Sequence, residues 1–274
     1  MPISFRPIAA LGLLCLALSI ALPRQAKAAL SGIECTIILD AASGRTLRRE
    51  GGCEQRVSPA STFKVALALI GYDAGILTNE HTPAWDYRPE YDAPRSNQKT
   101  VDPVIWERDS IVWFSRELTR RLGKDKFAGY VNKLGYGNQD VSGDPGRDNG
   151  LSQAWISSSL KISPDEQVAF LRRIFTHGLP VSDKAYAMTQ AILPSFSSGD
   201  GWVVQGKTGS CWFGDRSDKL DRTRPLGWFI GWAQRNGQRI VFARLVVSTD
   251  KTQMPLGLKV REKFLGDLPG LMKE

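Results

Sequence analysis

The chain has 274 residues, of which 42% are hydrophobic and 23% are charged, and its formal net charge is +8. This size and apolar content suffice for one substantial core or for two closely packed subdomains. The cations are scattered among acidic residues, as in the segment FGDRSDKLDRTR, and no stripe of cations alternates with aromatic residues. The composition therefore argues against nucleic acid as a partner, while a mildly cationic surface favours small anions.

The N-terminus has the pattern of a secretory signal. Arg6 precedes the apolar run AALGLLCLALSIAL, and the segment closes with the small residues AKAA. This pattern predicts a signal peptide over residues 1–28, which leaves 29–274 as a single mature domain in the periplasm. The apolar run is short for a membrane span, so an uncleaved anchor is only the alternative. No later stretch is long and apolar enough to cross a bilayer, so we expect no membrane association after cleavage.

Two predicted strands, CTIILD (35–40) and RTLRREGG (45–52), open the mature chain. Cys35 begins the first strand and Cys53 follows the second, so a hairpin brings the two thiols within bonding reach. Because an exported protein meets an oxidising compartment, we predict a Cys35–Cys53 disulfide, with Cys211 left as the odd thiol. Three unpaired, mostly buried cysteines are the alternative.

Helical patterns fill the middle of the chain. Apolar residues recur at helical spacing in residues 111–123, 124–135, 163–178 and 182–193. The third of these begins with Ser163, Pro164 and an acidic first turn, which is typical of a helix N-terminus. A Gly-rich segment at 134–150 is too long to be an idle loop in a compact domain.

Strand patterns return near the C-terminus, at residues 201–210, 225–234 and 239–248, and an amphipathic helix follows at 256–268. Strands at both ends with helices between them predict an α+β fold of the three-layer α/β type. In it, an antiparallel sheet formed by the N- and C-terminal segments is flanked by helices, with an all-helical subdomain inserted. We expect the sheet subdomain at about 29–66 and 196–274 and the helical subdomain at about 67–195.

Several kinds of chemistry are excluded. The two histidines, His81 and His177, lie in a polar loop and beside a helix-ending glycine, which is no context for a catalytic base. With so few histidines and cysteines, no metal-ligand spacing is found, and no metal is expected. The sequence also contains no G-x-S-x-G elbow and no phosphate-binding G-x-x-x-x-G-K-[ST] loop.

The segment SPASTFKVALAL places Lys64 among apolar residues, three positions after Ser61. This spacing puts both side chains on one face of a helix, near its N-terminus. Burial lowers the pKa of a lysine, and a neutral amine beside a serine hydroxyl activates a nucleophile without histidine. The alternative is a Ser61 that caps the helix and a Lys64 that reaches solvent.

Two further short patterns follow at characteristic distances. Ser110-Ile111-Val112 places a hydroxyl at the start of an apolar stretch, and Lys207-Thr208-Gly209-Ser210 ends a predicted strand. Gly209 allows a ligand to approach the backbone closely, while Lys207 and Thr208 offer a cation and a hydroxyl to a carboxylate. Each pattern alone is weak, but the order S-x-x-K, S-x-V, K-T-G is specific.

This order resembles the serine β-lactamase and penicillin-binding protein superfamily, and in detail the class D (OXA-type) β-lactamases. The resemblance covers nearly the whole mature chain and includes PASTFK at Ser61, SIV at Ser110, YGN at Tyr136, WISSSLKISPDEQ from Trp155, and KTG at Lys207. It implies an exported hydrolase of β-lactams that acts through a serine acyl-enzyme and confers β-lactam resistance. S-D-N and E-x-x-L-N, which mark class A, are absent.

The resemblance also implies roles for single residues. Ser61 is the nucleophile, and Lys64 reacts with carbon dioxide to become N6-carboxylysine, the general base. Ser110 passes a proton to the leaving nitrogen, with Lys207 tuning it electrostatically. Trp155 donates its indole N–H to the carbamate, and Val112 and Ile156 line it with apolar surface. The backbone N–H groups of Ser61 and Ser210 form the oxyanion hole.

The remaining expectations concern ligands and partners. Thr208, Gly209 and Ser210 bind substrate, and an arginine of the last helix holds the substrate carboxylate. Arg261 matches that place better than Lys259, because an arginine binds a carboxylate through two hydrogen bonds; a surface arginine paired with a local acid is the alternative. Tyr136 and Asn138 organise their loop. No cofactor is expected beyond carbon dioxide or bicarbonate, the partner is a small β-lactam, and the protein is a monomer or homodimer.

Two other functions fit the same three patterns. A penicillin-binding D,D-peptidase acylates on the same serine but acts on a peptidoglycan stem. A non-hydrolytic β-lactam sensor acylates without turnover, but such a domain belongs on a larger membrane receptor, and the expected cleavable signal with no other span argues against it.

Overall fold

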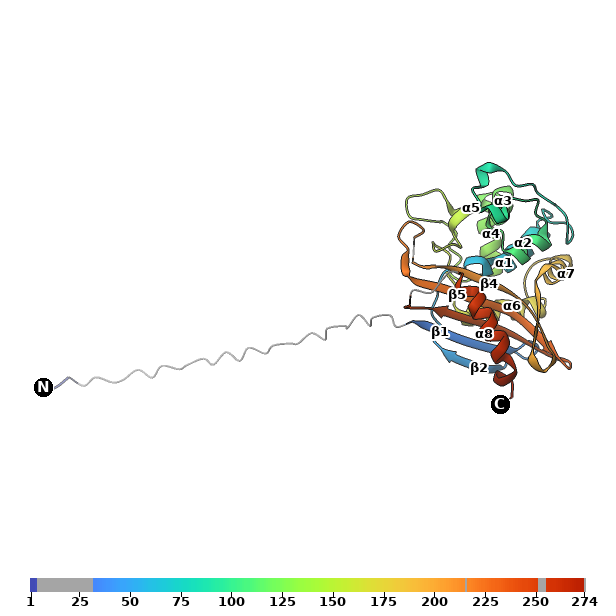
Figure 1. Ribbon diagram of the computed structural model, residues 1–274. Coiled ribbons are helices and arrows are strands. Elements are labelled where there is room, and N and C mark those ends of the chain that lie inside the picture. Colours follow the sequence, from blue (N-terminus) through green and yellow to red (C-terminus); the bar gives the residue numbers. More distant parts are fainter. Residues whose placement is uncertain (4–31, 215, 251–254, 274) are drawn as a thin grey trace. The chain divides into compact units, whose positions relative to one another are not determined.

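The computed structural model describes residues 1–3, 32–214, 216–250 and 255–273. Residues 4–31, which hold most of the expected signal peptide, lie outside the described residues. Within the described ranges the chain forms one antiparallel sheet with helices packed on it, as Figure 1 shows. The predicted α+β fold class is confirmed. No described helix has the length and apolar character needed to cross a membrane.

The sheet joins N-terminal and C-terminal segments of the chain. Its strands are β1 (Ile33–Asp40), β2 (Thr46–Gly51), β3 (Ser195–Ser198), β4 (Trp202–Phe213), β5 (Asp221–Arg235) and β6 (Gln238–Val247). They lie in the order β2-β1-β6-β5-β4-β3, and Ile33 of β1 is paired with Val247 of β6. The five strands predicted from the sequence are confirmed. Sequence patterning does not predict β3, because its four residues, SFSS, include only one apolar side chain.

The helices are α1 (Phe63–Asp73), α2 (Pro103–Asp109), α3 (Val112–Leu122), α4 (Lys124–Leu134), α5 (Gly150–Gln153), α6 (Pro164–Phe175), α7 (Asp183–Ile192) and α8 (Leu256–Leu271). Five helices, α3, α4, α6, α7 and α8, occupy the segments where a helix was predicted, and α1 follows Ser61 as expected, whereas α2 and α5 were not predicted. Short 3-10 turns lie at Ala60–Thr62 (η1), Pro89–Tyr91 (η2), Arg95–Asn97 (η3) and Gly199–Gly201 (η4). The predicted start of α6 is confirmed, because Ser163 and Glu166 form a reciprocal capping box around Pro164.

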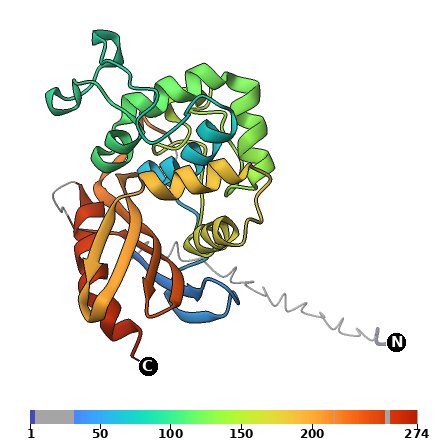
Figure 2. The same cartoon turned by 90° about the vertical axis from the view of Figure 1, so that its right-hand side faces the viewer.

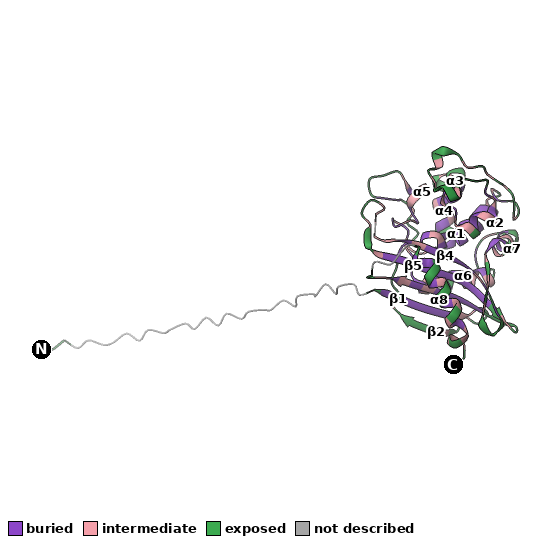
Figure 3. Ribbon diagram, viewed as in Figure 1, coloured by how far each residue is buried: buried purple, intermediate pink, exposed green. Residues whose placement is uncertain are grey.

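The alternation of side chains along each strand separates two hydrophobic cores. Ile38 and Phe242 face α8 in the smaller core, whereas their neighbours Ile37 and Val241 face the larger one. The larger core contains α1, α3, α4, α6 and α7, and Figure 2 shows these helices above and beside the sheet. α6 lies within the range expected for the helical subdomain, yet it packs against β1, β5 and β6. Figure 3 shows the buried colour running through the central strands.

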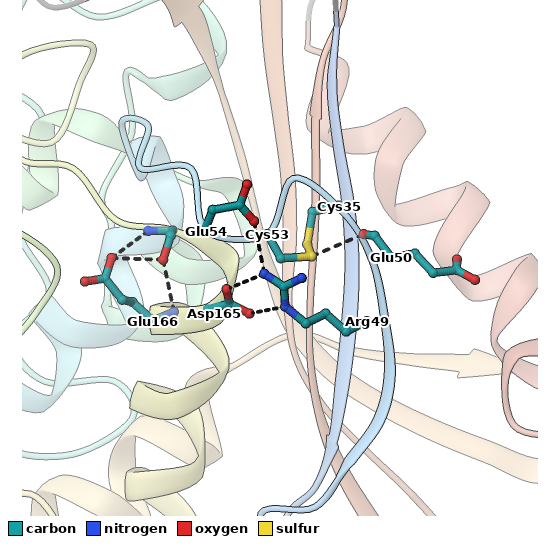
Figure 4. Close-up of a disulfide and its surroundings, with 8 residues drawn as sticks. Cys35, Arg49, Glu50, Cys53, Glu54, Asp165 and Glu166 are labelled. Atoms are coloured by element: carbon teal, nitrogen blue, oxygen red, sulfur yellow. Dashed lines mark hydrogen bonds and ion pairs between the residues drawn. A yellow bond between two sulfur atoms is a disulfide. The ribbon is translucent and has the colours of Figure 1, made fainter.

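A disulfide joins Cys35 at the start of β1 to Cys53, which follows β2, so the predicted pairing is confirmed. Figure 4 shows that this bridge lies beside the N-terminus of α6. The backbone of Cys53 accepts a hydrogen bond from Asp165, and Arg49 of β2 forms an ion pair with the same aspartate. The bridge therefore holds the hairpin against α6 at the point where the chain leaves the sheet toward η1. Among the described cysteines, Cys211 is the free one, and it is buried.

We predict that replacing both Cys35 and Cys53 by serine lowers the free energy of unfolding by about 3 kcal/mol. The bridge closes a loop between cysteines 18 positions apart, and opening it gives the unfolded chain more conformational freedom. Urea unfolding of the oxidised protein and of the double variant measures the difference. A reducing agent should bring the wild type down to the variant and leave the variant unchanged; equal stability of the two oxidised proteins would contradict the prediction.

Candidate active site

The turn η1 carries Ser61, directly before α1 and in contact with β4. Ala60, immediately before it, is buried and adopts a left-handed backbone with φ of 49°. Non-glycine residues avoid this region, and residues held there are common at functional sites. Ser61 is half-buried and does not cap α1, whose N-cap is Thr62 without a side-chain cap. The helix-capping alternative for Ser61 is therefore wrong.

Lys64 lies on the first turn of α1 with only 1% of its surface exposed. Its Nζ lies 3.3 Å from the Oγ of Ser61, to which it donates a hydrogen bond. Burial, together with the nearby cations Lys207 and Arg116, lowers the pKa of Lys64 to about 7 against the smaller, opposite effect of Glu107. The side chain of Lys64 does not reach solvent. Near neutral pH, its amine is uncharged in a large fraction of the molecules.

Ser110 and Lys207 form a second serine–lysine pair. Ser110 ends α2 in a left-handed conformation with φ of 57°, which turns its side chain away from the helix axis. Its Oγ accepts a hydrogen bond of 3.0 Å from Nζ of Lys207, which also donates to the carbonyl of Thr208 at 3.1 Å. Lys207 is 2% exposed, and burial lowers its pKa. Two lysine–serine pairs thus lie in one buried region.

Strand β4 presents the K-T-G-S residues next to the serine turn. A Cβ on Gly209 would lie 2.9 Å from the carbonyl oxygen of Pro59 and 3.0 Å from Thr62. Sequence reasoning assigned the close approach at Gly209 to a ligand; in the structure the approaching group is the backbone before Ser61. Ser210 directs its hydroxyl to α8, where it accepts a hydrogen bond of 2.8 Å from the N–H of Gly257. Thr208 remains half-buried.

Trp155 belongs to an aromatic cluster that covers Lys64's helix. Its indole stacks on Phe63 with ring centres 5.6 Å apart, and Phe127 packs edge-on against it. Ser58 fixes this segment, because its hydroxyl donates to the carbonyl of Trp155 at 2.8 Å and accepts from the N–H of Ser157. Val112 and Ile156, the expected apolar lining, are both half-buried.

The two candidate carboxylate anchors differ in their surroundings. Arg261 hydrogen-bonds to its neighbour Glu262 at 2.6 and 3.0 Å and lies over the ring of Phe196. Its charge also contributes to lowering the pKa of Lys207, behind burial and against the opposite effect of Glu107, so the guanidinium is near enough to act on the site. Lys259 is exposed. The structure thus shows the local acid pairing that was the alternative for Arg261, and the anchor remains a prediction.

The Y-G-N segment organises a loop, as expected. Asn138 forms hydrogen bonds to the backbone of Ser159 and Lys161, and the hydroxyl of Tyr136 accepts one from Gln167. Gly137 has a positive φ, and a Cβ there would collide with the carbonyl of Lys161. These contacts are structural and none reaches Ser61.

Asp144, in the Gly-rich loop, was missed from the sequence. The carboxylate is buried and accepts hydrogen bonds from Asn149 at 2.9 Å and Ser158 at 2.7 Å, and from both the N–H and the hydroxyl of Ser217. Burial alone raises the pKa of Asp144, but the donated hydrogen bonds outweigh it and lower the pKa below its ordinary value. One anion thus joins the loop, the Trp155 segment and the connection after β4.

Glu107, on α2, is the second residue that sequence reasoning missed. It is fully buried, and burial raises its pKa, while the positive charges of Lys207 and Lys64 act in the opposite direction. Its spacing, three residues before Ser110, is the one signal in the sequence that could have indicated it. Among the described residues no cluster of three or more potential metal ligands is found.

Comparisons with known proteins match most of the chain. The model of the penicillin binding protein transpeptidase domain matches residues 35–269. Beta-lactamase OXA-9 of Klebsiella pneumoniae is 51% identical over 242 residues, which cover 88% of each chain. Beta-lactamase OXA-1 of Escherichia coli is 33% identical over 84% of this chain and 82% of its own.

Solved structures show the same relationship. The class D β-lactamase OXA-427 superposes with a TM-score of 0.79 at 38% identity, covering 88% of this chain and 98% of its own. The C-terminal domain of the Bacillus licheniformis BlaR penicillin-receptor has a TM-score of 0.73 at 22% identity over 89% of this chain and 92% of its own. At that identity the second likeness concerns the fold alone.

We predict that Asp144→Asn lowers the free energy of unfolding at neutral pH by about 2 kcal/mol, because the amide places donors against donors. The lowered pKa means that the wild-type carboxylate stabilises the fold above its ordinary pKa of 3.8 and loses this effect as the pH falls through its lower folded value. The difference in free energy of unfolding between the wild type and Asp144→Asn should therefore become smaller at acidic pH. Urea unfolding at several pH values measures it.

Asp148→Asn provides the matched control, since Asp148 lies in the same loop but is exposed and paired only with Lys124. An exposed pair contributes little, so this variant should unfold like the wild type. If Asp148→Asn lost as much free energy of unfolding as Asp144→Asn, replacing any aspartate of this loop would be destabilising. The specific role assigned to Asp144 would then be contradicted.

Proposed function

The chain belongs to the class D β-lactamases, and from this premise we propose that it is an exported enzyme whose Ser61 forms the acyl-enzyme and whose Lys64 acts as a carbamate. As a β-lactamase it hydrolyses β-lactams, and its relatives OXA-9 and OXA-1 carry that name. The observation that carries the proposal is the hydrogen bond between the buried Nζ of Lys64 and Oγ of Ser61.

The surroundings of Lys64 suit the addition of carbon dioxide. Only a neutral amine reacts with carbon dioxide, and burial lowers the pKa of Lys64 toward neutrality. Apolar Phe63 and the aromatic face of Trp155 adjoin the amine's helix, which favours a small neutral reactant over water. Once formed, a carbamate supplies an anionic oxygen that takes the Ser61 proton and orients the hydrolytic water.

The other residues of the site support acylation and proton transfer. Ser61 lies at the strained turn beside β4, where its own N–H and that of Ser210 would stabilise the oxyanion. Lys207 donates to Ser110, which keeps the hydroxyl oriented and favours its passing a proton to the leaving nitrogen of the β-lactam. The half-buried Thr208 and the cation of Lys207 suit the substrate carboxylate.

The export of the enzyme is part of the proposal. The sequence of residues 1–28 supports it, and so does the Cys35–Cys53 disulfide, since such bridges persist in oxidising compartments. The rival functions are distinguished by turnover. A burst of acylation by a chromogenic cephalosporin that is not followed by turnover would favour the receptor-like sensor over the hydrolase.

We predict that turnover depends on both pH and dissolved carbon dioxide. Because the pKa of Lys64 lies at about 7, the neutral amine dominates above that pH and falls about tenfold per pH unit below it. At a fixed, low concentration of dissolved carbon dioxide, activity should therefore decline from about pH 8 to about pH 6, and added bicarbonate should restore it. Steady-state rates with and without bicarbonate measure this, and a ¹³C carbamate resonance identifies the species.

Two variants control this measurement. Ser61→Ala should form no penicillin adduct by intact-mass spectrometry while retaining the carbamate resonance. Lys64→Ala should acylate slowly, stall as an acyl-enzyme and gain nothing from bicarbonate. Turnover that is independent of bicarbonate, with no carbamate resonance in the wild type, would leave Lys64 as a plain amine base.

We predict that Arg261→Ala lowers kcat/KM by roughly 30-fold, equivalent to about 2 kcal/mol for one lost charge-assisted contact to the substrate carboxylate. Lys259→Ala, two residues earlier on the exposed side of α8, should change kcat/KM far less. Initial rates at low substrate concentration measure both. The reverse ranking would move the carboxylate anchor to Lys259.

A further inference from the structure

Glu107 is a fully buried acid that the mechanism above does not use. Neither of its carboxylate oxygens has a hydrogen-bond partner within the described part of the chain. By contrast Glu117, which is also buried, binds Arg120 and Arg121. An ionised carboxylate without partners is strongly unfavourable in an apolar interior, so Glu107 must either be neutral or face charge of the opposite sign.

Two lysines from different elements act on Glu107. Lys207 on β4 and Lys64 on α1, when protonated, both stabilise its anion. Glu107 in turn acts on Tyr72 of α1: burial, and then the charge of Glu107, raise the pKa of Tyr72, which stays a neutral phenol. On α2 itself, Arg108 pairs with Asp109.

Other packed elements add few charges. Arg116 of α3 acts on Lys64, and the acid and base of α7, Asp183 and Lys184, are exposed. Ser110, which ends the helix of Glu107 three residues later, accepts the hydrogen bond of 3.0 Å from Nζ of Lys207, so α2 and β4 meet here. Glu107, Lys64 and Lys207 thus form one buried cluster, with exposed fractions of 0%, 1% and 2%.

The addition of carbon dioxide would change the charge of this cluster. A neutral lysine amine becomes a carbamate anion and a proton is released, so an ionised Glu107 nearby would leave two buried anions facing Lys207 alone. Such an arrangement is unfavourable where water is scarce, since like charges repel strongly in a medium of low polarity. A group that takes up the released proton inside the cluster removes this cost.

We propose that Glu107 is the internal acceptor of the proton that Lys64 releases when it adds carbon dioxide, an inference that rests on the carbamylation proposed above. The nitrogen lone pair of Lys64 forms the N–C bond, and one C=O electron pair moves to oxygen. The N–H bond then breaks, and the proton passes to the Glu107 carboxylate, directly or through water. The cluster keeps its net charge: an amine and a carboxylate become a carbamate and a carboxylic acid.

This proton transfer determines how the affinity for dissolved carbon dioxide depends on pH, which can be measured. Above the pKa of Lys64, where its amine is neutral, the wild-type cluster would bind carbon dioxide without releasing a proton to solvent. If residue 107 is not ionisable, the same reaction releases one proton. The dissociation constant for dissolved carbon dioxide should then change tenfold per pH unit, whereas in the wild type it should stay nearly constant.

The experiment compares the wild type with Glu107→Gln. Labelled bicarbonate is titrated into each protein between about pH 7.5 and pH 8.5, and the carbamate resonance in the ¹³C spectrum gives the dissociation constant for dissolved carbon dioxide. We expect a change of less than about twofold over this range for the wild type and about tenfold for Glu107→Gln. Equal pH dependence in the two proteins would overturn the assignment of Glu107.

Two further variants test whether the effect comes from the loss of the ionisable group at position 107. Glu107→Leu removes the ionisable group without burying an unpaired amide, and it should show the same tenfold dependence as Glu107→Gln. Glu117→Gln removes another buried acid, one already neutralised by arginines, and should behave like the wild type. A wild type without any carbamate resonance would instead reject the carbamylation itself, so the two failures are distinguishable.

Discussion

The site depends on an amine that is held out of water next to a hydroxyl. Lys64 is enclosed by the core of α1 and by the aromatic rings packed on Phe63, yet its Nζ reaches Ser61. An ammonium there would be costly, so the fold stabilises the neutral amine. The proposed acylation chemistry and the proposed addition of carbon dioxide both depend on this one consequence of burial.

The sheet controls how closely the reactive groups approach one another. Gly209 has no side chain, so the turn that carries Ser61 can lie against β4. Lys207 is placed by its position on the same strand, whose pairing with β5 is continuous from Val203 to Trp212. Ser110 comes from the helical side, at the end of α2, and the hydrogen bond from Lys207 connects the two halves of the site.

Much of this architecture could be predicted from the sequence, because it follows from local patterns. Strand alternation, the capping signals at Ser163 and the apolar context of Lys64 each depend on neighbours along the chain. The Cys35–Cys53 pairing followed from hairpin geometry and from the compartment. These predictions needed no knowledge of which helices meet.

The features that were missed depend on contacts between distant segments. From the sequence, Glu107 is an ordinary charged residue in the segment WERD, and only the tertiary packing around α2, which contacts α3 and α7, buries it. Asp144 reads as a loop aspartate until Ser217, 73 positions later in the sequence, donates to it. Ser210 was expected to bind substrate, with its backbone N–H in the oxyanion hole, and the hydrogen bond that its hydroxyl accepts from the N–H of Gly257 on α8 was not foreseen. Composition and spacing carry no information about such pairs.

The strand order has a consequence for how the protein is made. β1 pairs with β2 and with β6, and Figure 1 shows these N- and C-terminal strands side by side. Since Ile33 is paired with Val247, the ribosome must synthesise most of the chain before the centre of the sheet can close. The smaller hydrophobic core can form only after α8 has been synthesised, because side chains of α8 are part of it. A nascent chain with this topology cannot complete its sheet before β6 has been synthesised, so Lys64 on α1 gains the closed sheet beneath its helix only late in synthesis.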